Sequence, residues 1–246
     1  MAMLNYKLIV EYDGTRFCGW QSQIGVDTVQ DELEAALRKL FQTEIRLMAA
    51  GRTDAGVHAT AQVANFRTPV VFDCQILKDA LNGLTRRDVV VHKIELVPER
   101  FHARFDAKAR QYRYGITLQP MAIQRHCYYY CRYPVNPELM IEASSIFEGV
   151  HRFEAFARKS PKEKHYLCRV EKLEWDYCLE KGTMNLQIKA NRFLHSMIRL
   201  IVGSLVDVGR GKKSIAELQG LLEGSCSTDA RFKAPACGLT LEKVFY

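Results

Sequence analysis

The apolar positions of the chain switch repeatedly between the two-residue spacing of strands and the three-to-four-residue spacing of helices. Tyr6–Glu11 (YKLIVE) is rich in β-forming residues and is followed by the turn signal Asp13-Gly14, which predicts a strand that leaves into a loop. After Thr28, a candidate helix N-cap, apolar residues recur on one helical face: Val29, Leu33, Ala36, Leu37 and Leu40. The same criteria predict strands at Ile45–Ala49, His58–Phe66 and Val89–Leu96, and a helix at Ile76–Leu84.

The second half of the chain follows the same outline. Asn136-Pro137 is typical of a helix start, with Gly149 as its end, and Ser214 with Glu217 predicts a capping box for a helix that ends near Gly224. Further strands are predicted at Arg110–Thr117, Val170–Tyr177, Thr183–Ala190 and Leu239–Tyr246, and an apolar helix at Phe193–Val208. Helices that interrupt paired strands favour an α+β fold, with mixed or antiparallel sheets that carry helices on one face. A soft boundary near Phe105–Ala109 divides the chain into an N-terminal half, 1–106, and a C-terminal half, 107–246.

Composition restricts the class of protein and its compartment. The chain has 246 residues, of which 48% are hydrophobic and 26% charged, an ordinary globular balance. No apolar run approaches the ~20 residues of a membrane span, and the N-terminus does not have the layout of a signal peptide. The eight cysteines are scattered, and Cys127 and Cys131 lack the second pair that a zinc site requires. We therefore expect free thiols in the reducing cytoplasm and no metal.

Charge adds one hint about partners. Lys and Arg total 35 against 28 acidic residues, which gives a formal charge of +7. Phosphate contacts need cations, so this excess suits a polyanionic partner, although a merely basic protein would have the same composition.

The segment GRTDAG, Gly51 to Gly56, carries the most distinctive chemistry. A core strand would not place Arg52, Thr53 and Asp54 in a row beside glycines, so the segment is predicted to be a loop. A lone aspartate in such a loop is most often a turn-former that bonds its own backbone, and Arg52 fits either a phosphate contact or a solvated charge. From local chemistry alone, Asp54 is therefore a candidate with a common structural alternative.

Two aromatic segments admit stacking on bases. Glu11–Gln23 (EYDGTRFCGWQSQ) sets Phe17 and Trp20 beside arginine; core packing is favoured for Phe17, and both roles stay open for Trp20. Arg110–Tyr114 (RQYRY) follows Phe101-His102-Ala103-Arg104-Phe105. On a strand, Tyr112 and Tyr114 would share one face. Tyr112 could stack on a base or pass a proton, while a packed aromatic strand is the more common outcome.

Asn191–Leu205 (NRFLHSMIRLIVGSL) places one cation on a mostly apolar helix. Phe193, Met197, Ile201 and Leu205 form the apolar face, while Ser196, Arg199 and Gly203 lie on another. Buried arginine is rarely tolerated without a partner, which favours a carboxylate partner for Arg199 over simple exposure to solvent.

Five ordered blocks together resemble the motifs of the bacterial tRNA pseudouridine synthase A family. The blocks are EYDGTRFCGWQ, GRTDAGVHA, FHARFDAKARQYRY, NRFLHSMIRLIVGSL and APACGLTLEKVFY, and the resemblance runs from about Tyr6 to Tyr246. GRTDAGVHA is the most specific of them. The chain departs from the family at Ala61, where glycine is common before Gln-Val, and at Leu84-Thr85, where Leu-Pro is usual; both departures lie outside the catalytic motif.

The resemblance implies an activity that requires neither a metal nor another cofactor. Members isomerise uridine at positions 38 to 40 of the tRNA anticodon stem-loop, and the essential aspartate corresponds to Asp54. The reaction breaks the N1–C1′ bond, rotates the base and joins C5 to C1′. Two roles for the carboxylate remain open: covalent addition to the nucleoside, or removal of a proton from the sugar to give a glycal-type intermediate.

The resemblance also implies roles for three further residues. Arg52 resembles the arginine that helps hold the flipped nucleotide, Tyr112 matches the tyrosine that stacks on the target base and could take the C5 proton, and Arg199 matches the arginine that pairs with Asp54. Such an ion pair would keep Asp54 ionised. The implied fold is the pseudouridine synthase fold, two halves that flank a basic RNA-binding cleft, and the implied assembly is a homodimer that binds tRNA.

Two other functions fit parts of the sequence. A non-catalytic RNA-binding module would share the basic loops and aromatic residues, but it has no reason to keep Asp54 in a positive cleft, where the acid repels phosphate. A related synthase could act on another RNA through a different recognition loop. Arg158–His165 (RKSPKEKH), predicted to be a polar surface loop, is the segment that could redirect it.

Overall fold

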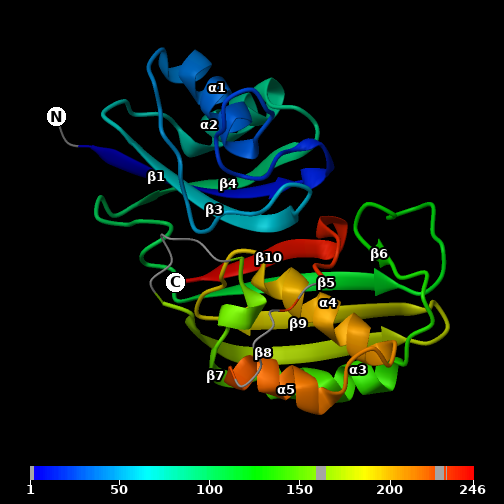
Figure 1. Ribbon diagram of the computed structural model, residues 1–246. Helices are drawn as coiled ribbons and strands as arrows, with labels where there is room; N and C mark the ends of the chain where they lie inside the picture. The colour runs from blue at the N-terminus through cyan, green and yellow to red at the C-terminus, as the bar shows by residue number, and fades with distance from the viewer. Residues whose placement is uncertain (1–2, 159–164, 225–229, 231) are drawn as a thin grey trace. The chain divides into compact units, whose positions relative to one another are not determined.

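The computed structural model, which describes residues 3–158, 165–224, 230 and 232–246, confirms the α+β class (Figure 1). The chain forms two compact units. Unit 1 comprises Met1–Lys108 and Thr240–Tyr246, and unit 2 comprises Ala109–Leu239. The last strand therefore belongs mainly with the N-terminal part, a difference from the division at 106/107. The reason is a long-range parallel pairing of Thr240 with His58 and of Leu241 with Ala59, which spacing along the chain does not reveal.

The part of the sheet that belongs to unit 1 has five strands among the described residues. Its strands are β1 (Leu4–Tyr12), β2 (Met48–Ala49), β3 (His58–Thr68), β4 (Val89–Val97) and β10 (Leu239–Phe245). The order is β4-β1-β3-β10, with β1 antiparallel to both neighbours and the short β2 paired antiparallel with β3. Tyr6, Leu8 and Val10 are fully buried at alternate positions of β1, so one face of this strand supplies the core.

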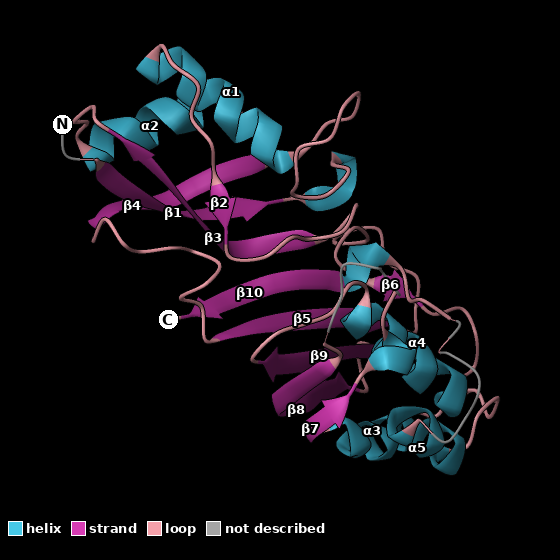
Figure 2. Ribbon diagram, turned by 60° about the vertical axis from the view of Figure 1, so that its left-hand side comes forward, coloured by secondary structure: helices cyan, strands magenta, loops and turns pink. Residues whose placement is uncertain are grey.

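Two helices, α1 (Val29–Phe41) and α2 (Cys74–Leu84), cover one face of the unit 1 sheet (Figure 2). The Thr28 side chain accepts the backbone N–H of Asp31, which confirms Thr28 as the N-cap of α1. Leu33 and Leu37 of α1 are fully buried, as their spacing predicts.

The part of the sheet that belongs to unit 2 has antiparallel main strands. It contains β5 (Ala109–Thr117), β6 (Tyr129–Tyr130), β7 (Gly149–Arg152), β8 (Leu167–Cys178) and β9 (Thr183–Ala190). The order is β5-β9-β8-β7, and the two-residue β6 runs parallel beside β5. Three helices lie along this sheet (Figure 2): α3 (Pro137–Ser144), α4 (Met197–Gly209) and α5 (Ile215–Glu223). The predicted capping box of Ser214 and Glu217 is present in α5.

Short 3₁₀ turns complete the two units at Gly14–Arg16, Ser145–Phe147, Glu154–Phe156 and Ala236–Gly238.

None of the helices in the described part of the chain is long and apolar enough to cross a membrane.

Two helix boundaries differ from the predictions by four residues or more. The apolar helix begins at Met197 rather than Phe193, because Ser196 has a left-handed backbone (φ 62°) that interrupts the helix before its first turn. The helix after Asn136 ends at Ser144, where the Ser144 and Ser145 hydroxyls donate to carbonyls of the preceding turn and a 3₁₀ turn follows. Gly149 opens β7 instead of ending that helix. Within the predicted polar loop at Arg158–His165, residues 159–164 lie outside the described residues.

Candidate active site

The GRTDAG segment forms the connection between β2 and β3 in unit 1, as a loop rather than a strand. Within it Arg52 is exposed, Thr53 is buried and Asp54 is half-buried. The Asp54 carbonyl accepts the N–H of Val57 at 3.2 Å, and Gly56 takes a positive φ of 77°, so the loop closes in a tight turn directly after the aspartate. Asp54 is therefore presented at the bend of a structured loop.

The connection between β1 and α1 holds this loop from one side. The Tyr12 hydroxyl and the Thr53 Oγ1 share a hydrogen bond of 2.8 Å, and the backbone N–H of Trp20 donates to the Thr53 carbonyl at 3.2 Å. The Gly56 N–H donates to the Phe17 carbonyl at 3.2 Å. The residues on both sides of Asp54 are thus fixed by a segment about forty positions earlier in the chain.

Glycines in that connection let the two backbones touch. A Cβ on Gly14 would lie 2.0 Å from the Val57 carbonyl oxygen, and one on Gly19 would lie 2.5 Å from the Thr53 carbonyl oxygen. Gly19 also has a φ of +90°, which side chains rarely permit. The Gly14 N–H donates to Nδ1 of buried His58 at 3.0 Å, just beyond the loop. The two glycine turns of EYDGTRFCGWQ are therefore required for close approach to GRTDAG.

Strand β3 fixes the other side of the loop. The Ala50 N–H donates to the Val63 carbonyl at 2.8 Å, and the buried Gln62 side chain donates from Nε2 to the Gly51 carbonyl at 2.9 Å. The backbone on the N-terminal side of Arg52 is consequently ordered, so the exposed Arg52 side chain starts from a fixed position.

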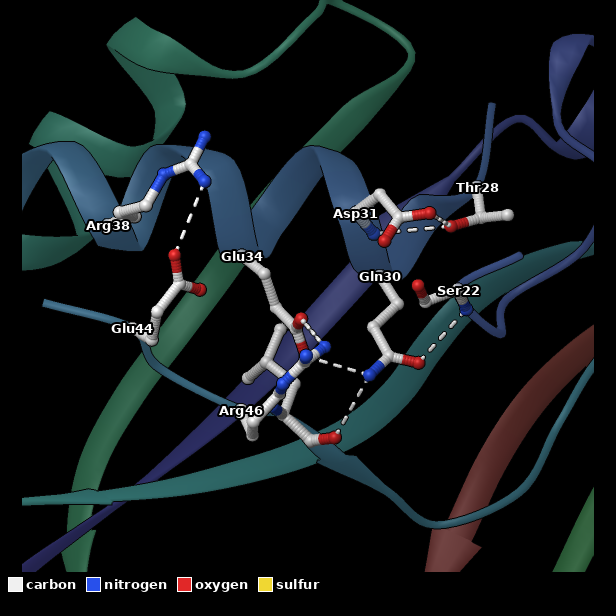
Figure 3. Close-up of polar contacts among 9 residues, drawn as sticks. Ser22, Thr28, Gln30, Asp31, Glu34, Arg38, Glu44 and Arg46 are labelled. Carbon is white, nitrogen blue, oxygen red and sulfur yellow. Dashed lines mark hydrogen bonds and ion pairs between the residues drawn. The ribbon is translucent and has the colours of Figure 1, made fainter. Parts of the chain in front are cut away.

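Helix α1 links the connection that precedes it with the segment that leads into β2 and the loop (Figure 3). The Gln30 Oε1 accepts the Ser22 N–H at 3.2 Å, and its Nε2 donates to Glu34 Oε1 at 2.7 Å. The same Glu34 oxygen accepts the Leu47 N–H at 2.8 Å, while Glu34 Oε2 pairs with Arg46 Nη1 at 3.2 Å. The Glu34 carboxylate is buried, so these bonds replace its hydration.

Tyr112 lies on β5 in unit 2, opposite Ile188 of β9. Its side chain is buried, with 8% exposure, and its ring meets the Phe193 ring edge-on at 5.2 Å between centroids. Tyr114, two positions on, is also buried, and its hydroxyl donates to the Pro235 carbonyl at 2.7 Å. Burial raises the pKa of Tyr114 well above its usual value, and the positive charge of Arg199 opposes this shift only partly. Tyr114 is thus a neutral structural donor.

Arg199 lies on the first turn of α4 and bonds the segment before β10. Its Nε donates to the Ala234 carbonyl at 2.8 Å, and the Ala234 N–H donates to the Arg199 carbonyl at 3.0 Å. Gly203, one turn later, makes this approach possible, since a Cβ there would lie 1.8 Å from the Phe232 carbonyl oxygen. Gly203 thus leaves the space that the Phe232 carbonyl occupies.

The four predicted site residues fall into two pairs. Asp54 and Arg52 share one loop of unit 1, and Tyr112 and Arg199 belong to unit 2. The ion pair between Asp54 and Arg199 stays a prediction. Phe17 and Trp20 are both core residues, with 3% and 2% exposure, so the open question about Trp20 is answered in favour of packing.

The supporting residues Tyr12, Gly14 and Gly19 are a part of the site that the sequence did not single out. Their signal was present in the two glycine turns of the early block, but turns alone do not say which backbone lies against them. Their contacts with Thr53 and Val57 show that two of the five sequence blocks form one structural element.

Comparison with known proteins identifies the family. The profile of a family described as tRNA pseudouridine synthase matches residues 8–106 and 143–246, which include Arg52, Asp54 and Arg199 but not Tyr112. Proteins named tRNA pseudouridine synthase A from Chlorobium limicola, Chlorobium phaeovibrioides and Thermoanaerobacter sp. are 40%, 42% and 39% identical to this chain. Each alignment covers 99% of this chain and 100% of the relative. The resemblance found in the sequence blocks is confirmed, and the chain belongs to the tRNA pseudouridine synthase family.

Proposed function

We propose that this chain converts uridine to pseudouridine at positions 38, 39 and 40 of the tRNA anticodon stem-loop, with Asp54 as the catalytic residue. Membership of the family supports the reaction. The observation that carries the assignment to Asp54 is its place in a loop whose flanking residues are held from two sides by hydrogen bonds of the buried Tyr12 and Gln62 side chains. A carboxylate that only formed a turn would not need a neighbouring segment shaped to its loop by two glycines.

The reaction can be balanced with a single carboxylate. In one route, Asp54 attacks C1′ while the N1–C1′ bond breaks, and C5 of the rotated base then displaces the carboxylate. In the other, Asp54 takes a proton from C2′ as the N1–C1′ bond breaks, and returns it when C5 joins C1′. Both routes end with loss of the C5 proton and gain of a proton at N1, so no oxidant, reductant or cofactor is consumed.

The other three residues have roles around this step. A base in a helical stem must leave the stack before a side chain can reach it, and Arg52, exposed on the same loop, holds the displaced nucleotide through its phosphate. Tyr112 stacks on the target base, and Arg199 pairs with the Asp54 carboxylate.

The proposal includes the setting of the enzyme. Its partner is tRNA, and the cytoplasm is its compartment. Its assembly is a homodimer, which light scattering on the purified protein checks; a monomer would contradict this part alone.

The experiment incubates the protein with unmodified tRNA transcripts and maps new pseudouridines by sequencing after carbodiimide treatment. We expect product only in the anticodon arm, and none with Asp54→Asn, a variant that retains shape and tRNA binding because the two side chains are nearly isosteric. Product elsewhere in the tRNA would contradict the positions, and normal product from Asp54→Asn would contradict the role of Asp54.

A further inference from the structure

An exposed aromatic ring stands on a short turn of unit 1 that the catalytic assignment does not use. Phe105 is 76% exposed. The His102 ring lies 4.4 Å from it between centroids, and the Arg104 guanidinium carbon lies 5.7 Å from its centroid. A large apolar ring beside an imidazole and an arginine, left in solvent, is a surface on which a flat π-system can stack.

The turn that carries Phe105, His102–Asp106, is internally bonded. The His102 N–H donates to Asp106 Oδ2 at 2.9 Å, and the Asp106 N–H donates to the His102 carbonyl at 3.1 Å. His102 Nδ1 accepts the Arg104 N–H at 3.1 Å. A ligand that stacks on Phe105 would therefore meet an ordered backbone, which reduces the conformational entropy lost on binding.

Buried asparagines anchor this turn to the sheet. Asn5 donates from Nδ2 to the Phe101 carbonyl at 2.8 Å, and Asn65 Oδ1 accepts the Ala103 N–H at 2.9 Å. The two asparagines are joined by a bond of 2.9 Å from Asn65 Nδ2 to Asn5 Oδ1, and both are buried. Tyr246 donates its hydroxyl proton to the Ala103 carbonyl at 2.8 Å. Such a buried network specifies one geometry for the segment that precedes Phe105.

The surroundings of the turn favour a polyanionic ligand. The residues that precede it help line an open hollow of about 520 Å³, whose lining is Arg67, Pro98, Glu99 and Arg100. A second copy of this chain, with its own formal charge of +7, is a poor match for such a surface. Unpaired nucleotides combine a stacking base with a negative phosphate, which matches an aromatic ring flanked by arginine.

We propose that Phe105 stacks on an unpaired base of the tRNA substrate, at a second RNA-binding site remote from Asp54. Asn5, which holds the Phe105 turn, and Tyr12, which holds the Asp54 loop, are seven residues apart on β1, about 20 Å for an extended strand. The site therefore takes a nucleotide other than the target uridine. This inference rests on the proposed function only in the identity of the RNA.

The experiment measures the dissociation constant of an unmodified tRNA transcript by filter binding. Phe105→Ala should weaken binding about tenfold, since a stacked base commonly contributes that much or more. Phe105→Trp should bind tRNA as tightly as the wild type. The wild type already contains Trp20 and Trp175, so the tryptophan fluorescence of Phe105→Trp should be quenched by tRNA more strongly than that of the wild type. Leu179→Ala is the matched control, because Leu179 is equally exposed at 75% in the turn between β8 and β9, and its removal should leave binding unchanged.

The outcomes separate this inference from the catalytic one. Phe105→Ala binding within twofold of the wild type, with no quenching in Phe105→Trp, would overturn the stacking site even if pseudouridine forms normally. A change of oligomeric state in Phe105→Ala would assign the ring to a protein interface and also overturn it. A wild type that binds tRNA through Phe105 but forms no pseudouridine would overturn the proposed function alone, and a wild type without tRNA affinity would overturn both.

Discussion

Asp54 in unit 1 and Arg199 in unit 2 are both positioned where glycine lets two backbones approach, but the glycines stand in different places. Around Asp54 they belong to the supporting segment: Gly14 and Gly19 lie against Val57 and Thr53. Around Arg199 the glycine is on the same helix, where Gly203 lies against the Phe232 carbonyl. The Arg199 side chain is itself part of that contact, through its bond to the Ala234 carbonyl.

In unit 1, the residues that support the loop are different from the proposed catalytic residue. In unit 2, Arg199 has both a proposed role in catalysis and a hydrogen bond that supports the fold. In unit 1, the support of the loop can be changed without touching Asp54. In unit 2, removal of Arg199 also removes a hydrogen bond from a charged donor, worth about 1.5–3 kcal/mol of stability in typical proteins. Substitutions in the two regions should therefore differ in how activity and stability change together.

Among variants that keep Asp54, the largest effect is expected for Arg199→Ala. Loss of the cation should lower single-turnover pseudouridine formation by about 100- to 1000-fold, the range found when one preorganised charge or donor is removed from an active site. The free energy of unfolding, from urea denaturation, should fall as well because the Ala234 carbonyl loses its partner.

Gly203→Ala provides the matched control for Arg199. It disturbs the same contact with the 232–234 segment, since its Cβ would overlap the Phe232 carbonyl, but it keeps the charge. We expect lower stability and a loss of turnover no larger than the unfolded fraction explains. Equal turnover losses in the two variants would mean that Arg199 acts through the fold alone.

Gly19→Ala should have the next largest effect, on activity more than on stability. The new Cβ would lie 2.5 Å from the Thr53 carbonyl at a φ of +90°, so the loop that carries Asp54 must move. A displacement near 1 Å at a reacting group commonly costs about 100-fold in rate, and we expect a loss of about 10- to 100-fold.

Gly25→Ala tests whether the close contact of Gly19 matters, and not merely its backbone angle. Gly25 shares a positive φ of +80°, but no atom lies within 4 Å of its added Cβ. Its turnover should equal that of the wild type after correction for stability. A turnover loss in Gly25→Ala as large as that in Gly19→Ala would remove the argument that Gly19 positions the loop.

Elements with local signals were predictable from the sequence. Strand β9 has the predicted bounds Thr183–Ala190, and α5 has the predicted Ser214–Glu217 capping box, because alternation and capping depend on neighbouring residues. The predicted start of α4 at Phe193 was wrong, because the spacing of apolar residues does not reveal the left-handed backbone at Ser196. Strands β6 and β7 were missed, since two to four residues are too few to show a period.

The candidate site residues could be proposed from the sequence, but the residues that support them could not. Asp54 and Arg52 were assigned through the resemblance of GRTDAGVHA to a family motif, because local chemistry alone left a structural alternative open for both residues. The contacts of Gly14, Gly19 and Tyr12 with that loop depend on a tertiary arrangement of segments about forty residues apart. The secondary-structure propensities of neighbouring residues contain no information about such a contact.

Tyr12→Phe should have the smallest effect and the clearest control. The change removes only the hydroxyl that shares a 2.8 Å hydrogen bond with Thr53, next to Asp54, and one such bond contributes about 1 kcal/mol. Tyr6 lies toward the opposite end of the same strand, and its hydroxyl makes two hydrogen bonds with the Phe72 backbone. Tyr6→Phe should therefore lower the free energy of unfolding by at least as much. Urea denaturation and single-turnover rates on both variants separate the two contributions. Because the Tyr12 bond adjoins the catalytic loop, only Tyr12→Phe should also slow turnover, by a few-fold, whereas equal rates in the two variants would show that the loop keeps its position without the Tyr12 hydroxyl.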